Sequence, residues 1–241
     1  MSYYAKTVMV AIGAIIFSGF STIAWGSVVV NSTRVIYQAN KKEVTVTLTN
    51  QNTTPVLIQN WIETDSENRE SATKNVPFVL TPPINRVDAG KGQTLRISYL
   101  GSPALPQDRE SVFWLNILEV PAKAKDVNEE QSKLNIAFRT RIKLFYRPNG
   151  LPGTATQAME NLHWAIKGNG VNVTNPSKYY VSLFDVTYKS GGKKFDTKGF
   201  MLAPGATGFY QFKGISVTNI NDLSYTAVND YGANVQYKAK P

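Results

Sequence analysis

Apolar and polar residues alternate one by one through several short segments of this chain. In the segment Lys42–Asn50, Val44, Val46 and Leu48 share one face and three threonines share the other. A period of two is typical of a strand that buries one face. The same pattern assigns further strands to Val56–Glu63, Gln93–Leu100, Ser111–Val120, Lys133–Tyr146, Tyr179–Tyr188 and Ser224–Val228.

Clusters of Pro, Gly, Asn and Asp separate these segments, and no convincing amphipathic helix is visible. We therefore expect an all-β fold of antiparallel β-sandwiches rather than a parallel α/β sheet. Residues 147–153 read RPNGLPG, and a central strand does not continue through two prolines and two glycines. This segment predicts a boundary between domains at 27–147 and 148–241, each near the size of an immunoglobulin-like sandwich.

Residues 1–26 have the features of a secretory signal peptide. One charge, Lys6, precedes an apolar run that extends from Thr7 to Phe17. This run is shorter than the roughly 20 residues that a membrane anchor needs, which argues against the alternative of an uncleaved span. Small residues at Ala24 and Gly26 predict cleavage before Ser27. The mature chain has no apolar stretch long enough to cross a bilayer, so we expect an exported protein.

Composition excludes most familiar enzyme chemistry. The chain of 241 residues has no Cys and one His, His163, whose strand-like stretch Leu162–Ile166 contains no carboxylate and no second His. Disulfides, thiol catalysis and zinc–thiolate sites are therefore excluded, and we expect no catalytic residues, metal site or cofactor. The net charge of +9 is compatible with a nucleic acid, an anionic lipid or an acidic protein as partner, and by itself does not distinguish among them.

Three tryptophans lie among apolar residues, at Trp61, Trp114 and Trp164. We expect them to fill the sandwich cores. If their rings were exposed, they could instead stack on sugars or bases.

The segment after residue 132 is long for a single strand. Its parity places Leu134, Ile136 and Phe138 on one face and three cations, Arg139, Arg141 and Lys143, on the other. One interpretation is a long core strand with a solvated basic face. The other is an edge strand whose exposed apolar row pairs with another chain by strand addition. The polar loop at 122–132 fits a strand that extends beyond its own sheet.

Several motifs, in order, resemble a known family, from about residue 27 to the C-terminus. The motifs are TRVIY at 33–37, TPPINRV at 81–87, LPQDRESVFWLNILEVP at 105–121, IKLFYRP at 142–148, NPSKYYV at 175–181 and NDYG at 229–232. With these motifs in this order, the sequence resembles the periplasmic pilus (fimbrial) chaperones of the chaperone-usher pathway, the PapD-like family.

The resemblance implies two immunoglobulin-like domains at an angle, with a cleft that takes the C-terminus of a pilus subunit. By motif, Arg34 and Lys143 bind the terminal carboxylate, and Leu134, Ile136 and Phe138 of a donor strand at 133–147 fill the groove of a subunit that lacks its last strand. In an ideal strand Phe138 and Lys143 point to opposite faces. Either a twist or a bulge intervenes, or the carboxylate approaches from the cleft side while the apolar row faces the subunit groove.

The resemblance also implies that Glu110, Arg147 and Asp230 meet between the domains as a buried charge network. The alternative is three unrelated surface charges. The expected function is that of a periplasmic chaperone, not an enzyme, whose partners are pilus subunits and an outer-membrane usher, and not nucleic acid. The rival is an exported β-sandwich adhesin or carbohydrate-binding module.

Overall fold

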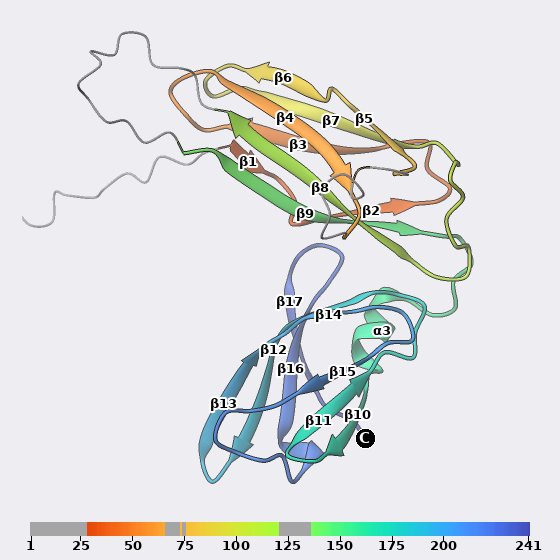
Figure 1. Cartoon of the computed structure of the whole chain (residues 1–241), viewed down its shortest axis with the longest axis vertical. Helices are drawn as coiled ribbons and strands as arrows, with labels where there is room; N and C mark the ends of the chain where they lie inside the picture. The colour runs from red at the N-terminus through yellow and green to blue at the C-terminus, as the bar shows by residue number, and fades with distance from the viewer. Residues whose placement is uncertain (1–27, 66–72, 74–75, 121–135) are drawn as a thin grey trace, which may run out of the picture.

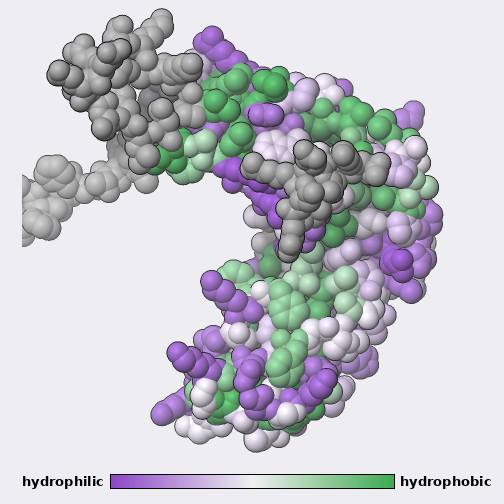
Figure 2. All heavy atoms as spheres, in the orientation of Figure 1, coloured by the Kyte–Doolittle hydropathy of each residue, from purple (hydrophilic) through white to green (hydrophobic). Residues whose placement is uncertain are grey.

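The computed structural model describes residues 28–65, 73, 76–120 and 136–241. The expected signal peptide at 1–26, the expected N-terminus at Ser27 and the side chain of Leu134 lie outside the described residues. The described chain forms two β-sandwiches that lie at an angle to each other (Figure 1), and the space-filling view shows the molecule hollowed on one side between them (Figure 2). The prediction of an all-β protein with two immunoglobulin-like domains is confirmed.

The first sandwich packs a four-stranded sheet, β1-β3-β7-β5, against a five-stranded sheet, β2-β9-β8-β4-β6. Its strands are β1 Val28–Val30, β2 Arg34–Gln38, β3 Val44–Asn50, β4 Val56–Glu63, β5 Phe78–Thr81, β6 Ile84–Val87, β7 Gly92–Tyr99, β8 Ser111–Val120 and β9 Phe138–Arg147.

The second sandwich packs a sheet of order β10-β11-β15 against one of order β13-β12-β16-β17, in which β14 also pairs with β12. Its elements are helix α3 Ala155–Glu160, β10 His163–Lys167, β11 Gly170–Thr174, β12 Val181–Ser190, β13 Lys193–Lys198, β14 Met201–Leu202, β15 Thr207–Tyr210, the 3-10 turn η1 Ile220–Asp222, β16 Leu223–Val228 and β17 Asn234–Lys238.

Each sandwich has its own core, built from the alternation seen in the sequence. In β3, Val46 and Leu48 are buried, whereas Thr45 and Thr47 are exposed. The buried residues of the two sandwiches form two separate clusters. Because each fully buried aliphatic or aromatic side chain contributes about 1.5–3 kcal/mol of transfer free energy, each cluster can stabilise its own domain.

The predicted strands lie where expected, apart from small shifts at their ends and one larger difference. Strands β4 and β8 have the predicted bounds. Strand β9 begins at Phe138, whereas the sequence predicted a strand from Lys133; of that start, Ile136 and Ala137 are described and are not in a strand. The last residue of β8 is Val120, one residue beyond the partner of Phe138, so among the described residues no strand position lies opposite Ile136.

The sequence pattern also missed helix α3. Six residues are too few for a helical period to be visible. A local signal was present, because the Thr154 side chain accepts a hydrogen bond from the backbone of Gln157 and caps the helix.

Strand β2 pairs with only half of β9. The chain leaves the first sheet after β1 and enters the second as β2, where Arg34–Gln38 runs parallel to 143–147. The other half of β9, from Phe138 to Ile142, pairs with β8 on one side. Within the described residues, its other edge has no strand beside it, so its backbone donors and acceptors remain open to an additional strand.

Candidate functional site

Arg34 and Lys143 meet at the junction of the two domains. They are directly paired positions on the parallel strands β2 and β9, so their side chains leave the sheet on the same face. Arg34 Nη1 donates to the backbone oxygen of Val228 over 2.9 Å, and Lys143 Nζ donates to Ser182 Oγ over 3.0 Å. The two cations, which we call the anchor pair, therefore lie against the second domain.

Neither cation of the anchor pair has an ion-pair partner within the described residues. In that part of the chain, no carboxylate lies within ion-pair distance of either side chain. Burial and the neighbouring charge of Arg34 lower the pKa of Lys143. The Arg34 Nε is buried, and no described residue forms a hydrogen bond with it. Two half-buried cations with a free donor favour an anion with two oxygens, because charge-assisted hydrogen bonds are the stronger ones.

Strand β9 continues from the anchor pair to an exposed apolar end. Ile136 is 53% exposed and Phe138 is 57% exposed, although both share the parity of the core residues Ile142 and Leu144. The pairing of β8 with β9 has one unbroken register from Ser111 to Glu119. No bulge therefore intervenes, and Phe138 and Lys143 lie on opposite faces of the strand.

A ladder of cations and aromatic rings covers the outer face between these two ends of β9. Arg139 Nη2 and Arg141 Nε both donate to Oε1 of Glu63, over 2.5 and 3.1 Å. The guanidinium of Arg139 lies 5.1 Å from the ring centre of Trp61, and that of Arg141 lies 4.0 Å from that of Trp114. The prediction of a merely solvated basic face missed these contacts, which stabilise the strand by cation–π and ionic interactions.

The ladder also corrects the expectation that all three tryptophans fill the cores. Trp164 is 1% exposed and lies in the core of the second sandwich. Trp61 and Trp114 are half-buried under the arginines on the outer face. In β8 the core positions are taken by Phe113 and Leu115, so the parity of the strand turns Trp114 outward.

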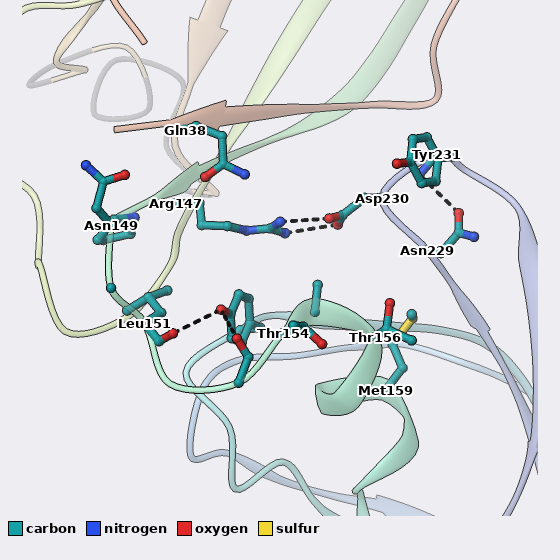
Figure 3. Close-up of a pocket in the computed structure, with 15 residues that line it drawn as sticks. Gln38, Arg147, Asn149, Leu151, Thr154, Thr156, Met159, Asn229, Asp230 and Tyr231 are labelled. Atoms are coloured by element: carbon teal, nitrogen blue, oxygen red, sulfur yellow. Dashed lines mark hydrogen bonds and ion pairs between the residues drawn. The ribbon is translucent and has the colours of Figure 1, made fainter. Parts of the chain in front are cut away.

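Glu110, Arg147 and Asp230 come together between the domains. Arg147 donates to Glu110 Oε1 over 2.5 Å and to both carboxylate oxygens of Asp230 over 2.7 and 2.9 Å. Glu110 also accepts the backbone N–H of Tyr180 over 2.7 Å. Figure 3 shows Arg147 and Asp230 facing each other from separate elements. The arginine thus links two carboxylates that belong to different domains.

Burial differs strongly within this network. The Glu110 side chain is 1% exposed, that of Arg147 is 12% exposed and that of Asp230 is 35% exposed. Burial raises the pKa of Glu110, against the opposing charge of Arg147. Burial alone would lower the pKa of Arg147, but hydrogen bonds to Asp230 and the charge of Glu110 raise it overall. Arg147 therefore stays charged, and it is the group that makes a buried Glu110 tolerable.

A pocket of about 400 Å³ lies beside the network, between the linker after β9, helix α3 and the β16–β17 turn (Figure 3). Its lining combines neutral polar residues, apolar residues such as Leu151 and Met159, and the already paired Arg147 and Asp230. Among the described residues no group of three or more His, Asp or Glu side chains is placed to hold a metal ion. The same residues include no helix with the length and apolar character needed to span a bilayer.

Two family models cover almost all of the chain after residue 26. The model for "Pili and flagellar-assembly chaperone, PapD N-terminal domain" matches residues 27–152. The model for "Pili assembly chaperone PapD, C-terminal domain" matches residues 157–239.

Individual proteins and solved structures agree with these matches. The probable fimbrial chaperone YadV of Escherichia coli K12 is 41% identical over 228 residues, which cover 92% of each chain. The chaperone protein FimB/FhaD of Bordetella pertussis is 42% identical over 233 residues, 95% of this chain and 94% of that protein. The crystal structure of the YadV chaperone has a TM-score of 0.75 at 38% identity, covering 88% of this chain and 98% of that one.

The structure of the Salmonella enterica SafA pilin in complex with the SafB chaperone is also similar, with a TM-score of 0.75 at 29% identity over 88% of this chain and 94% of that chain. The fold and these matches define a two-domain chaperone of immunoglobulin-like sandwiches, a class of binding protein and not an enzyme family. The chain belongs to the PapD family of pilus assembly chaperones.

Proposed function

We propose that this protein is a periplasmic chaperone that binds pilus subunits at the cleft between its domains, adds a strand to each subunit and delivers it to an outer-membrane usher. The observation that supports this most directly is the half-open edge of β9. An additional strand can pair with β9 from Phe138 to Ile142, but β2 occupies the edge from Lys143 onward. A chain bound there must therefore end, or turn away, beside the anchor pair.

A chain that ends at this point presents a terminal carboxylate to Arg34 and Lys143. The carboxylate would accept a hydrogen bond from the unpaired Nε of Arg34. Its charge would also offset the burial and the repulsion from Arg34 that together lower the pKa of Lys143. We therefore assign the anchor pair to the subunit's C-terminus. This assignment fixes the register of the subunit, because its last residue has one place on the strand.

The apolar end of β9 supplies the groove-filling residues, for which we propose Leu134, Ile136 and Phe138. Ile136 and Phe138 are exposed in the free chain, so they are available to a partner. Three such side chains would contribute roughly 5–9 kcal/mol of gross transfer free energy, before the cost of association. The opposite orientation of Phe138 and Lys143 fits a subunit that receives the apolar row while its carboxylate lies in the cleft. The donor segment is then 133–147, at the end of the first of the two domains that we propose, 27–147 and 148–241.

We expect Ile136→Asp to abolish subunit binding and leave the chaperone folded. Ile136 is 53% exposed, so the substitution removes little from the free protein's own core, whereas an unpaired carboxylate cannot enter an apolar groove without a penalty of several kcal/mol. The measurement is recovery of a co-expressed pilus subunit with the tagged chaperone from the periplasm, together with the chaperone's melting temperature.

The matched control is Ile84→Asp, because Ile84 is 56% exposed and lies on β6, at the far edge of the sheet from β9. It should bind subunits normally. Unfolding of the Ile136→Asp variant, or equal recovery of subunit by it, would contradict the donor-strand assignment.

We expect export to remove residues 1–26. The signal peptidase reads small side chains at Ala24 and Gly26, so the mature protein should begin at Ser27. N-terminal sequencing of periplasmic protein measures this directly. A Gly26→Arg variant, with a large charged side chain at the position before the cut, should accumulate uncleaved. An intact Met1 on the periplasmic wild-type protein would argue against this assignment.

A further inference from the structure

We infer that Phe184 on the second domain is a specificity contact for the subunit, and that it receives a bulky apolar side chain within the last few residues before the terminal carboxylate. Phe184 is 58% exposed. It lies two residues after Ser182, whose hydroxyl binds Lys143. This inference rests on the proposed function, since it takes the anchor pair as the place where the subunit ends.

A bulge in β12 turns the Phe184 ring outward. The register of β12 with β16 shifts between Leu183 and Asp185. As a result Leu183 and Val186 both lie in the core, and the Phe184 ring is left outside it. An extra residue of this kind re-aims a side chain, and bulges are over-represented beside functional sites.

The bulge is held rigidly by the segment that crosses it. The Gly199 N–H donates to the backbone oxygen of Phe184 over 2.8 Å, and the Leu183 N–H donates to that of Phe200 over 3.1 Å. A Cβ at position 199 would lie 2.2 Å from the Leu183 oxygen, so only glycine allows this approach. A ring on a fixed backbone loses little conformational entropy when it is contacted.

The ring lies beside a surface hollow that leaves space for a partner. Phe184 lines this hollow of about 370 Å³, whose exposed surface is mostly apolar, together with Asp185, Asp196, Thr197, Lys198 and Gly199. Polar groups near it are already paired, since Thr187 Oγ1 donates to Asp196 Oδ1 over 2.5 Å. An aromatic side chain in such a setting is stabilised when another apolar group covers it.

The position matches the last residues of a bound subunit. At about 3.3 Å per residue, Phe184 lies roughly 7 Å along β12 from Ser182, which already contacts the anchor pair. In a strand paired with β9, alternate side chains point to the face that bears Lys143 and therefore toward the second domain. One of the final side chains on that face can reach Phe184, while the apolar row enters the groove on the other face.

The test is a direct competition in the periplasm. Wild-type and Phe184→Ala chains with different C-terminal tags are co-expressed with a limiting amount of one pilus subunit, and the subunit recovered on each tag is compared, with the tags also exchanged. Because aromatic contacts are worth about 0.5–1.5 kcal/mol beyond their buried area, we expect roughly a 3- to 10-fold preference for wild type. Phe184→Leu, which keeps an apolar side chain, should recover most of this preference.

A double-mutant cycle identifies the partner side chain. Alanine is placed in turn at each of the last four residues of the subunit. For one of these subunit variants, the ratio of subunit recovered on wild type to subunit recovered on Phe184→Ala should fall to near one. The control Phe209→Ala changes an aromatic residue that is 45% exposed on β15, in the other sheet, and should show no preference.

The outcomes separate this inference from the proposed function. If wild type and Phe184→Ala recover equal amounts of a subunit whose binding still depends on Lys143, the role of Phe184 is overturned and that of the anchor pair is kept. A marked fall in the melting temperature of free Phe184→Ala would also overturn it, because the ring would then belong to the chaperone's own core. Failure of the wild-type chain to retain any subunit would instead contradict the proposed function.

Discussion

Replacing Lys143 by alanine is expected to weaken subunit binding about 30-fold or more and to leave the chaperone's folding intact. Truncating one partner of a buried charge pair at an interface costs about 2–5 kcal/mol, and each 1.4 kcal/mol is a factor of ten. In the free chaperone Lys143 has no ion pair among the described residues and lies beside Arg34. Its removal relieves this repulsion but also loses the hydrogen bond to Ser182, so the free energy of unfolding should change little.

The measurements are subunit affinity by competition, as above, and thermal unfolding of the free protein. Lys167→Ala is the control, because Lys167 is an exposed lysine on β10 of the second domain. A subunit whose terminal carboxylate is displaced by added residues should bind weakly to the wild type and equally weakly to Lys143→Ala. Full protection of subunits by Lys143→Ala, or a large loss of its stability, would show that the lysine has a different role.

The sequence predicts the strands well because their physical signal is local. Two inner strands, Val56–Glu63 and Ser111–Val120, have their predicted bounds, since alternation and turn residues are both readable within a few positions. The face that forms the core is harder to predict. Trp114 alternates with Phe113 and Leu115, and only the packing of the second sheet decides which set is buried.

The candidate site depends on contacts between distant parts of the chain. Arg34 and Lys143 are paired across two parallel strands, and nothing in their local sequence states that pairing. Resemblance to a family supplied it. Ser182 and Phe184 were not predicted, because a bulge in β12 and the approach of the second domain to β9 decide where they point. Gly199, where a side chain would collide with the backbone of Leu183, was the one local signal available.

Arg147→Ala is expected to destabilise the protein by about 3–5 kcal/mol and to reduce its accumulation in the periplasm. The reason is Glu110, whose side chain is 1% exposed and would keep a buried charge without its ionic partner, with only the Tyr180 N–H, among the described residues, still bound to it. The bidentate contact to Asp230 would be lost as well, which releases the turn after β16 from the first domain. Chemical denaturation of the purified protein measures the first effect, and immunoblotting of periplasmic extracts measures the second.

The control and the rescue separate a network from a simple loss of charge. Arg86→Ala removes an arginine that is 70% exposed and paired with Asp88, and should change stability by less than about 1 kcal/mol. Adding Glu110→Gln to Arg147→Ala removes the stranded charge and should recover part of the loss.

Acid should act in the same direction as this rescue. Burial raises the pKa of Glu110 above its value in the unfolded chain, and more so once Arg147 is absent. The folded state then binds a proton more tightly than the unfolded state. The penalty in Arg147→Ala should therefore be small at pH below the unfolded pKa of about 4.3 and grow as the pH rises through the folded value. A penalty in Arg147→Ala that does not change with pH, or wild-type stability of this variant, would show that the three charges do not act as one buried network.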